Sequence, residues 1–164
     1  MIKVGILGAT GYTGYELVKI LARHSEAELG FASSRTYAGQ RYDEIYPCPY
    51  DYLLVAPEDA PLDQVDVVFL CTPHAASAPL AEQVLGAGAS CVDLSADFRL
   101  RDLGVYEEWY GPHGAPALID EAVYGLTEIY REDVASARLI ANPGCYPTGP
   151  LLALIPLLER GLVR

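Results

Sequence analysis

The chain of 164 residues is long enough for one domain with a substantial core, and its hydrophobic content of 51% is typical of globular proteins. Its formal net charge of −11 argues against a nucleic acid or an anionic membrane as partner, because both require clustered Lys and Arg. The start at Met1 enters a strand-like run without a signal sequence, and no run is long enough to span a membrane. We therefore expect a cytoplasmic location.

Short apolar runs alternate with helical patterns along the chain. The runs typical of strands are Ile2 to Leu7, Glu28 to Ala32, a weaker one at Tyr52 to Val55, Val65 to Leu70, Ser90 to Leu94, and Leu139 to Ala141. Helices are expected over Thr13 to His24, with Leu17, Ile20 and Leu21 on the buried face, and over Ala75 to Leu85, ended by Gly86. This order predicts an α/β fold with a doubly wound, mostly parallel sheet, in which the run at 65–70 lies centrally.

The second half of the chain is less regular. Periodicity is poor from Asp97 to Glu132, and Asn142-Pro143-Gly144 breaks the chain before an apolar helix pattern over Leu151 to Leu158, where an internal proline should kink or restart the helix. Because the sequence stops at Arg164, soon after this helix, we expect a Rossmann-like cofactor domain over 1–146 and the start of a second domain over 147–164.

A glycine-rich turn follows the first strand and opens the first helix. Its residues are Gly8, Ala9, Thr10, Gly11, Tyr12, Thr13 and Gly14. Small residues at this place let the backbone approach a pyrophosphate at a helix N-terminus, which predicts dinucleotide binding; a purely structural turn is the alternative.

The end of the second strand indicates which dinucleotide is bound. NAD enzymes place an acidic side chain there, whereas this chain has Ser33, Ser34 and Arg35, whose hydroxyls and guanidinium suit the 2′-phosphate of NADP(H). The alternative is an ordinary solvated arginine. Cys71, Pro73 and His74 follow the central strand and are further candidates for the cofactor site, although a structural or capping role for His74 stays open.

The four cysteines and three histidines show neither C-x-x-C pairs nor metal-ligand spacing, so we expect no disulfide framework and no metal site. Cys71 and Cys91 end or lie within apolar runs and are expected to be small buried side chains. Cys145 instead follows a Pro-Gly turn immediately before a helix, where helix amides favour the nucleophilic thiolate. A buried structural cysteine is the alternative, but a thiolate beside a nicotinamide site suggests thioester chemistry.

Four segments together resemble the N-acetyl-gamma-glutamyl-phosphate reductase family, in family order and over nearly the whole chain. They are Leu7 to Gly14, Asp93 to Arg99, Tyr124 to Glu128 and Asn142 to Thr148. The resemblance implies that Cys145 is the catalytic nucleophile, that the glycine turn and residues 33–35 hold NADP, and that an acyl phosphate is reduced to N-acetylglutamate semialdehyde in arginine biosynthesis. It also implies a catalytic histidine in a second domain beyond Arg164, and we expect the complete enzyme to be a homo-oligomer.

Three further residues are candidates for substrate binding: Asp97, Arg99 and Asn142. Asp97 and Arg99 could orient a carboxylate or phosphate of the substrate, or form a salt-bridged loop. A related reductase of aspartyl phosphate or of carrier-linked aminoadipyl phosphate is a rival within the enzyme class. A non-catalytic NADP-binding module, with Cys145 only structural, is the rival outside it.

Overall fold

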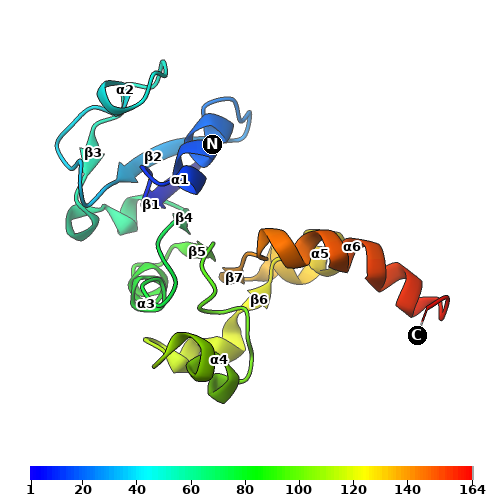
Figure 1. Ribbon diagram of the computed structural model, residues 1–164. Helices are drawn as coiled ribbons and strands as arrows, with labels where there is room; N and C mark the ends of the chain where they lie inside the picture. The colour runs from blue at the N-terminus through cyan, green and yellow to red at the C-terminus, as the bar shows by residue number, and fades with distance from the viewer. Residues whose placement is uncertain (164) are drawn as a thin grey trace.

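The computed structural model describes residues 1–163 and contains one sheet of seven strands in the order β3-β2-β1-β4-β5-β7-β6 (Figure 1). The strands are β1 (Ile2–Leu7), β2 (Ala27–Ser33), β3 (Leu54–Val55), β4 (Val67–Leu70), β5 (Ser90–Asp93), β6 (Val123–Tyr124) and β7 (Leu139–Ala141). Every neighbouring pair is parallel, so all carboxyl ends lie along one edge of the sheet. The predicted parallel α/β fold and the central place of the strand at 67–70 are confirmed.

Helices cover both faces of this sheet. They are α1 (Tyr12–Leu21), α2 (Tyr42–Ile45), α3 (Ala78–Gly86), α4 (Leu103–Tyr110), α5 (Thr127–Ser136) and α6 (Cys145–Glu159). One core joins Val4 and Ile6 of β1 to Val18 of α1, and a second core joins Val68 of β4 to Ala81 of α3. Because α1 and α3 pack on opposite faces, the sheet is doubly wound, as predicted. Within residues 1–163, every helix is too short or too polar to cross a bilayer.

The buried face of α1 includes the predicted Leu21, and the predicted Leu17 packs partly buried against the same core, but Ile20 does not belong to it. Gly14, Val18 and Leu21 are buried, whereas Ile20 is 55% exposed and Leu17 is only half-buried. The apolar spacing alone favoured Leu17 and Ile20, but Gly14 has to face the turn it packs against, which rotates residues 18 and 21 toward the sheet.

Other boundaries also differ from those predicted. The third strand is confined to Leu54–Val55, and the helix expected from Ala75 begins at Ala78, because the buried carboxylate of Asp97 holds the preceding backbone in a non-helical loop. The irregular stretch 97–132 contains α4, β6 and the start of α5, which short length and weak periodicity concealed.

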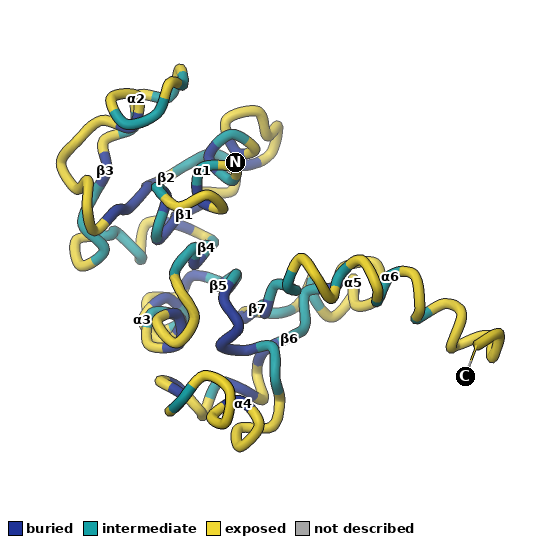
Figure 2. The backbone as a smooth tube through the Cα atoms, viewed as in Figure 1, coloured by how far each residue is buried: buried dark blue, intermediate teal, exposed yellow. Residues whose placement is uncertain are grey.

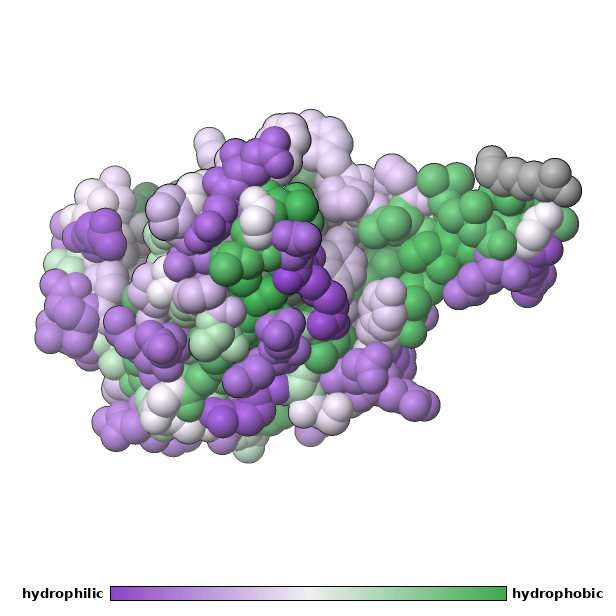
Figure 3. Space-filling model, turned by 90° about the horizontal axis from the view of Figure 1, so that it is seen from below, coloured by the Kyte–Doolittle hydropathy of each residue, from purple (hydrophilic) through white to green (hydrophobic). Residues whose placement is uncertain are grey.

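The last helix, α6, begins at Cys145 rather than at Leu151 and is continuous across Pro150 and Pro156, so of the two expected effects of the internal proline, a kink or a restart, the restart does not occur. It extends away from the sheet, and none of its residues is buried (Figures 1 and 2). Its apolar side chains lie at the surface, with Leu154 and Leu158 about half exposed (Figure 3). The expected domain boundary at 146/147 therefore falls inside one helix, and the division into two domains stays a prediction. Arg164, the last residue of the expected second segment, lies outside the described residues.

Gly14→Ala should destabilise the fold, because its Cβ would lie 2.4 Å from Gly8 O and 2.7 Å from Ala9 Cα. We expect the free energy of unfolding to fall by about 1–3 kcal/mol, the usual cost of overpacking. Gly86→Ala is the matched control, since a Cβ there meets open space, and it should stabilise the chain by about 0.4–1 kcal/mol. Equal midpoints for both variants in urea denaturation would contradict the close contact of α1 with the turn.

Candidate functional site

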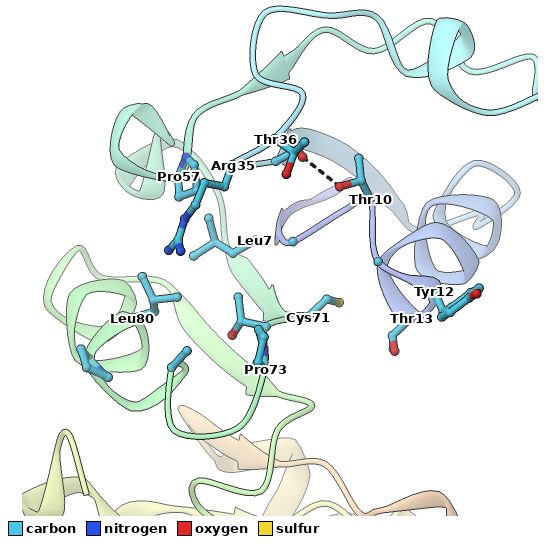
Figure 4. A pocket seen from close by; sticks show the side chains of 16 residues that line it. Leu7, Thr10, Tyr12, Thr13, Arg35, Thr36, Pro57, Cys71, Pro73 and Leu80 are labelled. Atoms are coloured by element: carbon cyan, nitrogen blue, oxygen red, sulfur yellow. Dashed lines mark hydrogen bonds between the residues drawn. The ribbon is translucent and has the colours of Figure 1, made fainter. Parts of the chain in front are cut away.

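A pocket with a volume of about 640 Å³ opens at the carboxyl edge of the sheet, where β1 and β4 lie side by side and the chain turns to opposite faces (Figure 4). We call it the edge pocket. It is lined by Leu7, Gly8, Thr10, Gly11, Tyr12, Thr13, Ser34, Arg35, Thr36, Pro57, Cys71, Thr72, Pro73, Ala76, Pro79 and Leu80. Its volume lies within the range of small-molecule sites, and its place is the topological switch point at which open α/β sheets bind ligands.

Glycine is needed at the three positions of the turn for different structural reasons. Gly8 has a φ of +89°, and a Cβ there would lie 2.5 Å from Cys71 O, so only glycine fits between β1 and β4. Gly14 allows α1 to pack directly on the turn. A Cβ on Gly11 would have no neighbour within 3.5 Å, so the absence of a side chain there keeps the pocket open to a ligand approaching the backbone.

The N-terminus of α1 faces this pocket with unsatisfied donors. Gly11 is the N-cap and provides no side-chain cap, and the first turn contains no acidic residue. No acceptor for the Tyr12 and Thr13 N–H groups is present among residues 1–163. These amides and the helix dipole make the turn a suitable binding site for an anion such as a pyrophosphate.

The end of β2 brings one cation into the edge pocket. Arg35 is exposed, makes no ion pair with any residue from 1 to 163, and points into the pocket beside Pro57 (Figure 4). Ser34 is buried, and its hydroxyl bonds that of Thr10 at 2.8 Å and accepts from Tyr37 N. Ser33 faces inward toward Gly8 N and does not line the pocket. The predicted trio is therefore divided: Arg35 and Ser34 reach the pocket, and Ser33 supports the turn.

The loop after β4 forms the opposite wall. Cys71 and Pro73 line the pocket, and burial raises the pKa of the Cys71 thiol to about 12, so this cysteine stays protonated and unreactive. His74 lies outside the lining; its Nδ1 accepts from Ala96 N at 2.9 Å, and its ring contacts that of Tyr110. The hydrogen bond between His74 and Ala96 connects the loop after β4 to the loop after β5.

Asp97 is fully buried and holds the backbone of the loop between β4 and α3 by hydrogen bonds. Its carboxylate accepts from the N–H groups of Ala75, Ser77 and Ala78 at 2.7–3.0 Å, and from the Tyr106 hydroxyl at 3.0 Å. Ala75 has a φ of +63°, a strained conformation for a residue with a Cβ, which this hydrogen bond helps to hold. All of the Asp97 acceptors face protein groups, so the geometry favours neither substrate contact nor the salt-bridged loop considered from sequence.

Arg99 and Asn142 meet beside Cys145. Arg99 donates from Nε to Asn142 O and from a terminal nitrogen to Leu94 O, both at 2.8 Å, and its other terminal nitrogen lies 3.1 Å from where a Cβ of Gly144 would be. Cys145 is exposed at the first position of α6, with Gly144 as N-cap. These residues lie at the same carboxyl edge as the edge pocket but outside its lining.

Sequence reasoning missed part of the pocket. Leu7, Thr36, Pro57, Thr72, Ala76, Pro79 and Leu80 line it but were not proposed. Leu7 ends β1, Thr36 directly follows Arg35, and the remaining residues lie in loops after β3 and β4 or on the first turn of α3. Parallel topology brings these carboxyl-end loops together, and that rule could have identified them before the structure was known.

Two curated relatives that match nearly the whole chain share one name. A relative from Ectopseudomonas mendocina (strain ymp), named N-acetyl-gamma-glutamyl-phosphate reductase, is 55% identical over 167 residues, covering 99% of this chain and 48% of the relative. One of the same name from Azotobacter vinelandii (strain DJ / ATCC BAA-1303) is 52% identical, with the same coverage. The chain thus spans about half the length of the curated relatives it matches.

Solved structures share the fold. Aspartate semialdehyde dehydrogenase II from Vibrio cholerae, complexed with ASA, superposes with a TM-score of 0.71 at 22% identity, over 97% of this chain and 47% of that one. Aspartate semialdehyde dehydrogenase with NADP from Candida albicans gives 0.62 at 19% identity, over 98% and 47% of the two chains.

The family model described as semialdehyde dehydrogenase, NAD binding domain, matches residues 3–137, which include the glycine turn and the loops after β2 and β4. This match covers most of the chain and agrees with the fold and with the position of the edge pocket. The chain belongs to the semialdehyde dehydrogenase NAD-binding domain family.

Proposed function

We propose that the edge pocket binds NADP(H) and that the chain forms the cofactor-binding part of an N-acetyl-gamma-glutamyl-phosphate reductase. The observation that carries the proposal is the joint presence, in one pocket, of an α1 N-terminus without a side-chain cap and of the Arg35 guanidinium, which forms no ion pair within residues 1–163. The first suits a pyrophosphate and the second a ribose 2′-phosphate. Their combination is specific for a dinucleotide that carries both groups.

The charge of the protein strengthens the role of Arg35. A net charge of −11 repels phosphate from the chain as a whole. An exposed arginine without an acidic partner in residues 1–163 provides a local positive charge that attracts it. The β2 end also lacks the carboxylate that would hydrogen-bond the ribose hydroxyls of NAD. Both features favour NADP(H) over NAD(H).

The chemical step is assigned to Cys145. Its sulfur, at the N-terminus of α6, would attack the acyl carbon as the thiolate while the C–O bond to phosphate breaks. When bound, the reduced nicotinamide cofactor supplies the hydride that converts the resulting thioester to an aldehyde and releases the thiolate. Arg99, whose remaining terminal nitrogen lies beside Gly144, would bind the anionic substrate.

The acetylglutamyl substrate is favoured over aspartyl phosphate by the relatives. The similar chains at 52–55% identity bear the acetylglutamyl name, whereas the aspartate semialdehyde dehydrogenases at 19–22% identity share only the fold. A cytoplasmic location, a homo-oligomeric state and a catalytic histidine in a further domain remain parts of this proposal.

Arg35→Ala should weaken NADPH binding by about 1.5–3 kcal/mol, the scale of a hydrogen bond to a charged group, and leave NADH binding nearly unchanged. Fluorescence titration of both cofactors measures this. Arg131→Ala, which removes another exposed arginine outside the pocket, is the control and should change neither affinity. Equal losses for NADPH and NADH in Arg35→Ala would refute the 2′-phosphate role.

Cys145→Ser should abolish NADPH-dependent reduction in the complete enzyme while cofactor binding persists, because a serine hydroxyl is a far poorer nucleophile at neutral pH. Cys48→Ser, at a half-buried cysteine outside the pocket, should retain turnover. Steady-state rates and NADPH titration of both variants provide the comparison. Substantial turnover by Cys145→Ser would show that the thiol has no chemical role.

A further inference from the structure

Two tyrosines that do not line the edge pocket hold the glycine turn by hydrogen bonds. They belong to the segment between β2 and β3, which includes α2. The hydroxyl of Tyr42 donates to Ala9 O at 2.8 Å, and that of Tyr46 donates to Thr10 O. Neither residue lines the pocket, and Tyr42 is completely buried. Two consecutive carbonyls of the turn are therefore held by residues more than 30 positions away in sequence.

The two hydroxyls are fixed in place by ring packing. The Tyr46 ring stacks on that of Tyr15 in α1 at 4.6 Å between centroids, and it lies 5.3 Å from the ring of Tyr42. Burial raises the pKa of both Tyr42 and Tyr46 above the ordinary tyrosine value. Both phenols therefore stay protonated at neutral pH and act as hydrogen-bond donors.

The geometry of the peptide bond gives these contacts a consequence inside the pocket. In a trans peptide the N–H points opposite to the C=O, so the bond from Tyr42 to Ala9 O directs the Thr10 N–H to the other side of the turn. For this N–H no acceptor is found in the part of the chain that the structure describes. The next N–H, of Gly11, closes the turn on Gly8 O at 3.2 Å.

The orientation matters because a carbonyl oxygen and an N–H have opposite effects on an anion. A turn whose carbonyls faced the pocket would repel a pyrophosphate, whereas one whose N–H groups face it would add to the donors of α1. We propose that Tyr42 and Tyr46 are positioning residues that keep the Ala9 and Thr10 carbonyls out of the edge pocket and so preorganise the glycine turn for the pyrophosphate of the cofactor. This inference rests on the proposed NADP(H) function.

The test uses Tyr42→Phe, Tyr46→Phe and the double variant of the 164-residue chain, titrated with two ligands. NADPH contains the pyrophosphate, and adenosine 2′-monophosphate lacks it but retains the 2′-phosphate expected to bind Arg35. Loss of one neutral hydrogen bond that orders the turn should weaken NADPH binding by about three- to tenfold per variant. Binding of adenosine 2′-monophosphate should be unchanged, a selectivity that a general loss of stability would not produce.

Tyr15→Phe is the matched control, because its ring belongs to the same stack but its hydroxyl has no partner in residues 1–163. It should bind both ligands like the unmodified chain. If Tyr42→Phe does not fold, the half-buried Tyr46 provides the decisive variant. Wild-type NADPH affinity in Tyr46→Phe, or equal losses for both ligands, would overturn the positioning role. Failure of the unmodified chain to bind NADPH would instead refute the proposed function itself.

Discussion

The close packing of α1 against the end of β1 is the constraint on which the rest of the site depends. It requires glycine at residue 14, where a Cβ would lie 2.4 Å from Gly8 O, and the neighbouring strand requires glycine at residue 8, where a Cβ would lie 2.5 Å from Cys71 O. Because of this packing, the first turn of α1 lies beside the carboxyl ends of β1 and β4, which are paired up to their last residues. Donors that a helix normally satisfies with a capping side chain are then left for a ligand.

Buried polar groups hold the loops around this point in place. Asp97 binds the backbone of the β4–α3 loop, and its own carbonyl is hydrogen-bonded by His113 Nε2 at 2.7 Å. Asp93, also buried, is bonded to Ser95, and burial raises its pKa above the ordinary value for Asp. Such groups are costly to bury without partners, so their complete pairing fixes one arrangement of the loops. Rigid walls reduce the ordering cost of binding a flexible dinucleotide.

The sequence was sufficient for the features that depend on local chemistry. Strand β1, the glycine turn and Arg35 were predicted at or near their observed positions, because apolar alternation and glycine spacing report directly on backbone structure. Features that depend on distant contacts were not predictable. The inward orientation of Ser33, the late start of α3 and the hydrogen bonds from Tyr42 and Tyr46 are determined by partners far away in sequence.

A dinucleotide bound as we propose would lie across β1 and β4, between the α1 N-terminus and Arg35. Backbone amide chemical shifts of the isotope-labelled chain, recorded with and without NADPH, test it directly. We predict that the largest changes occur in residues 10–13, 35–36, 71–72 and 76, which line the edge pocket. Changes centred instead on the separate pocket near Tyr124 and Arg138, or no changes at saturating NADPH, would contradict the account.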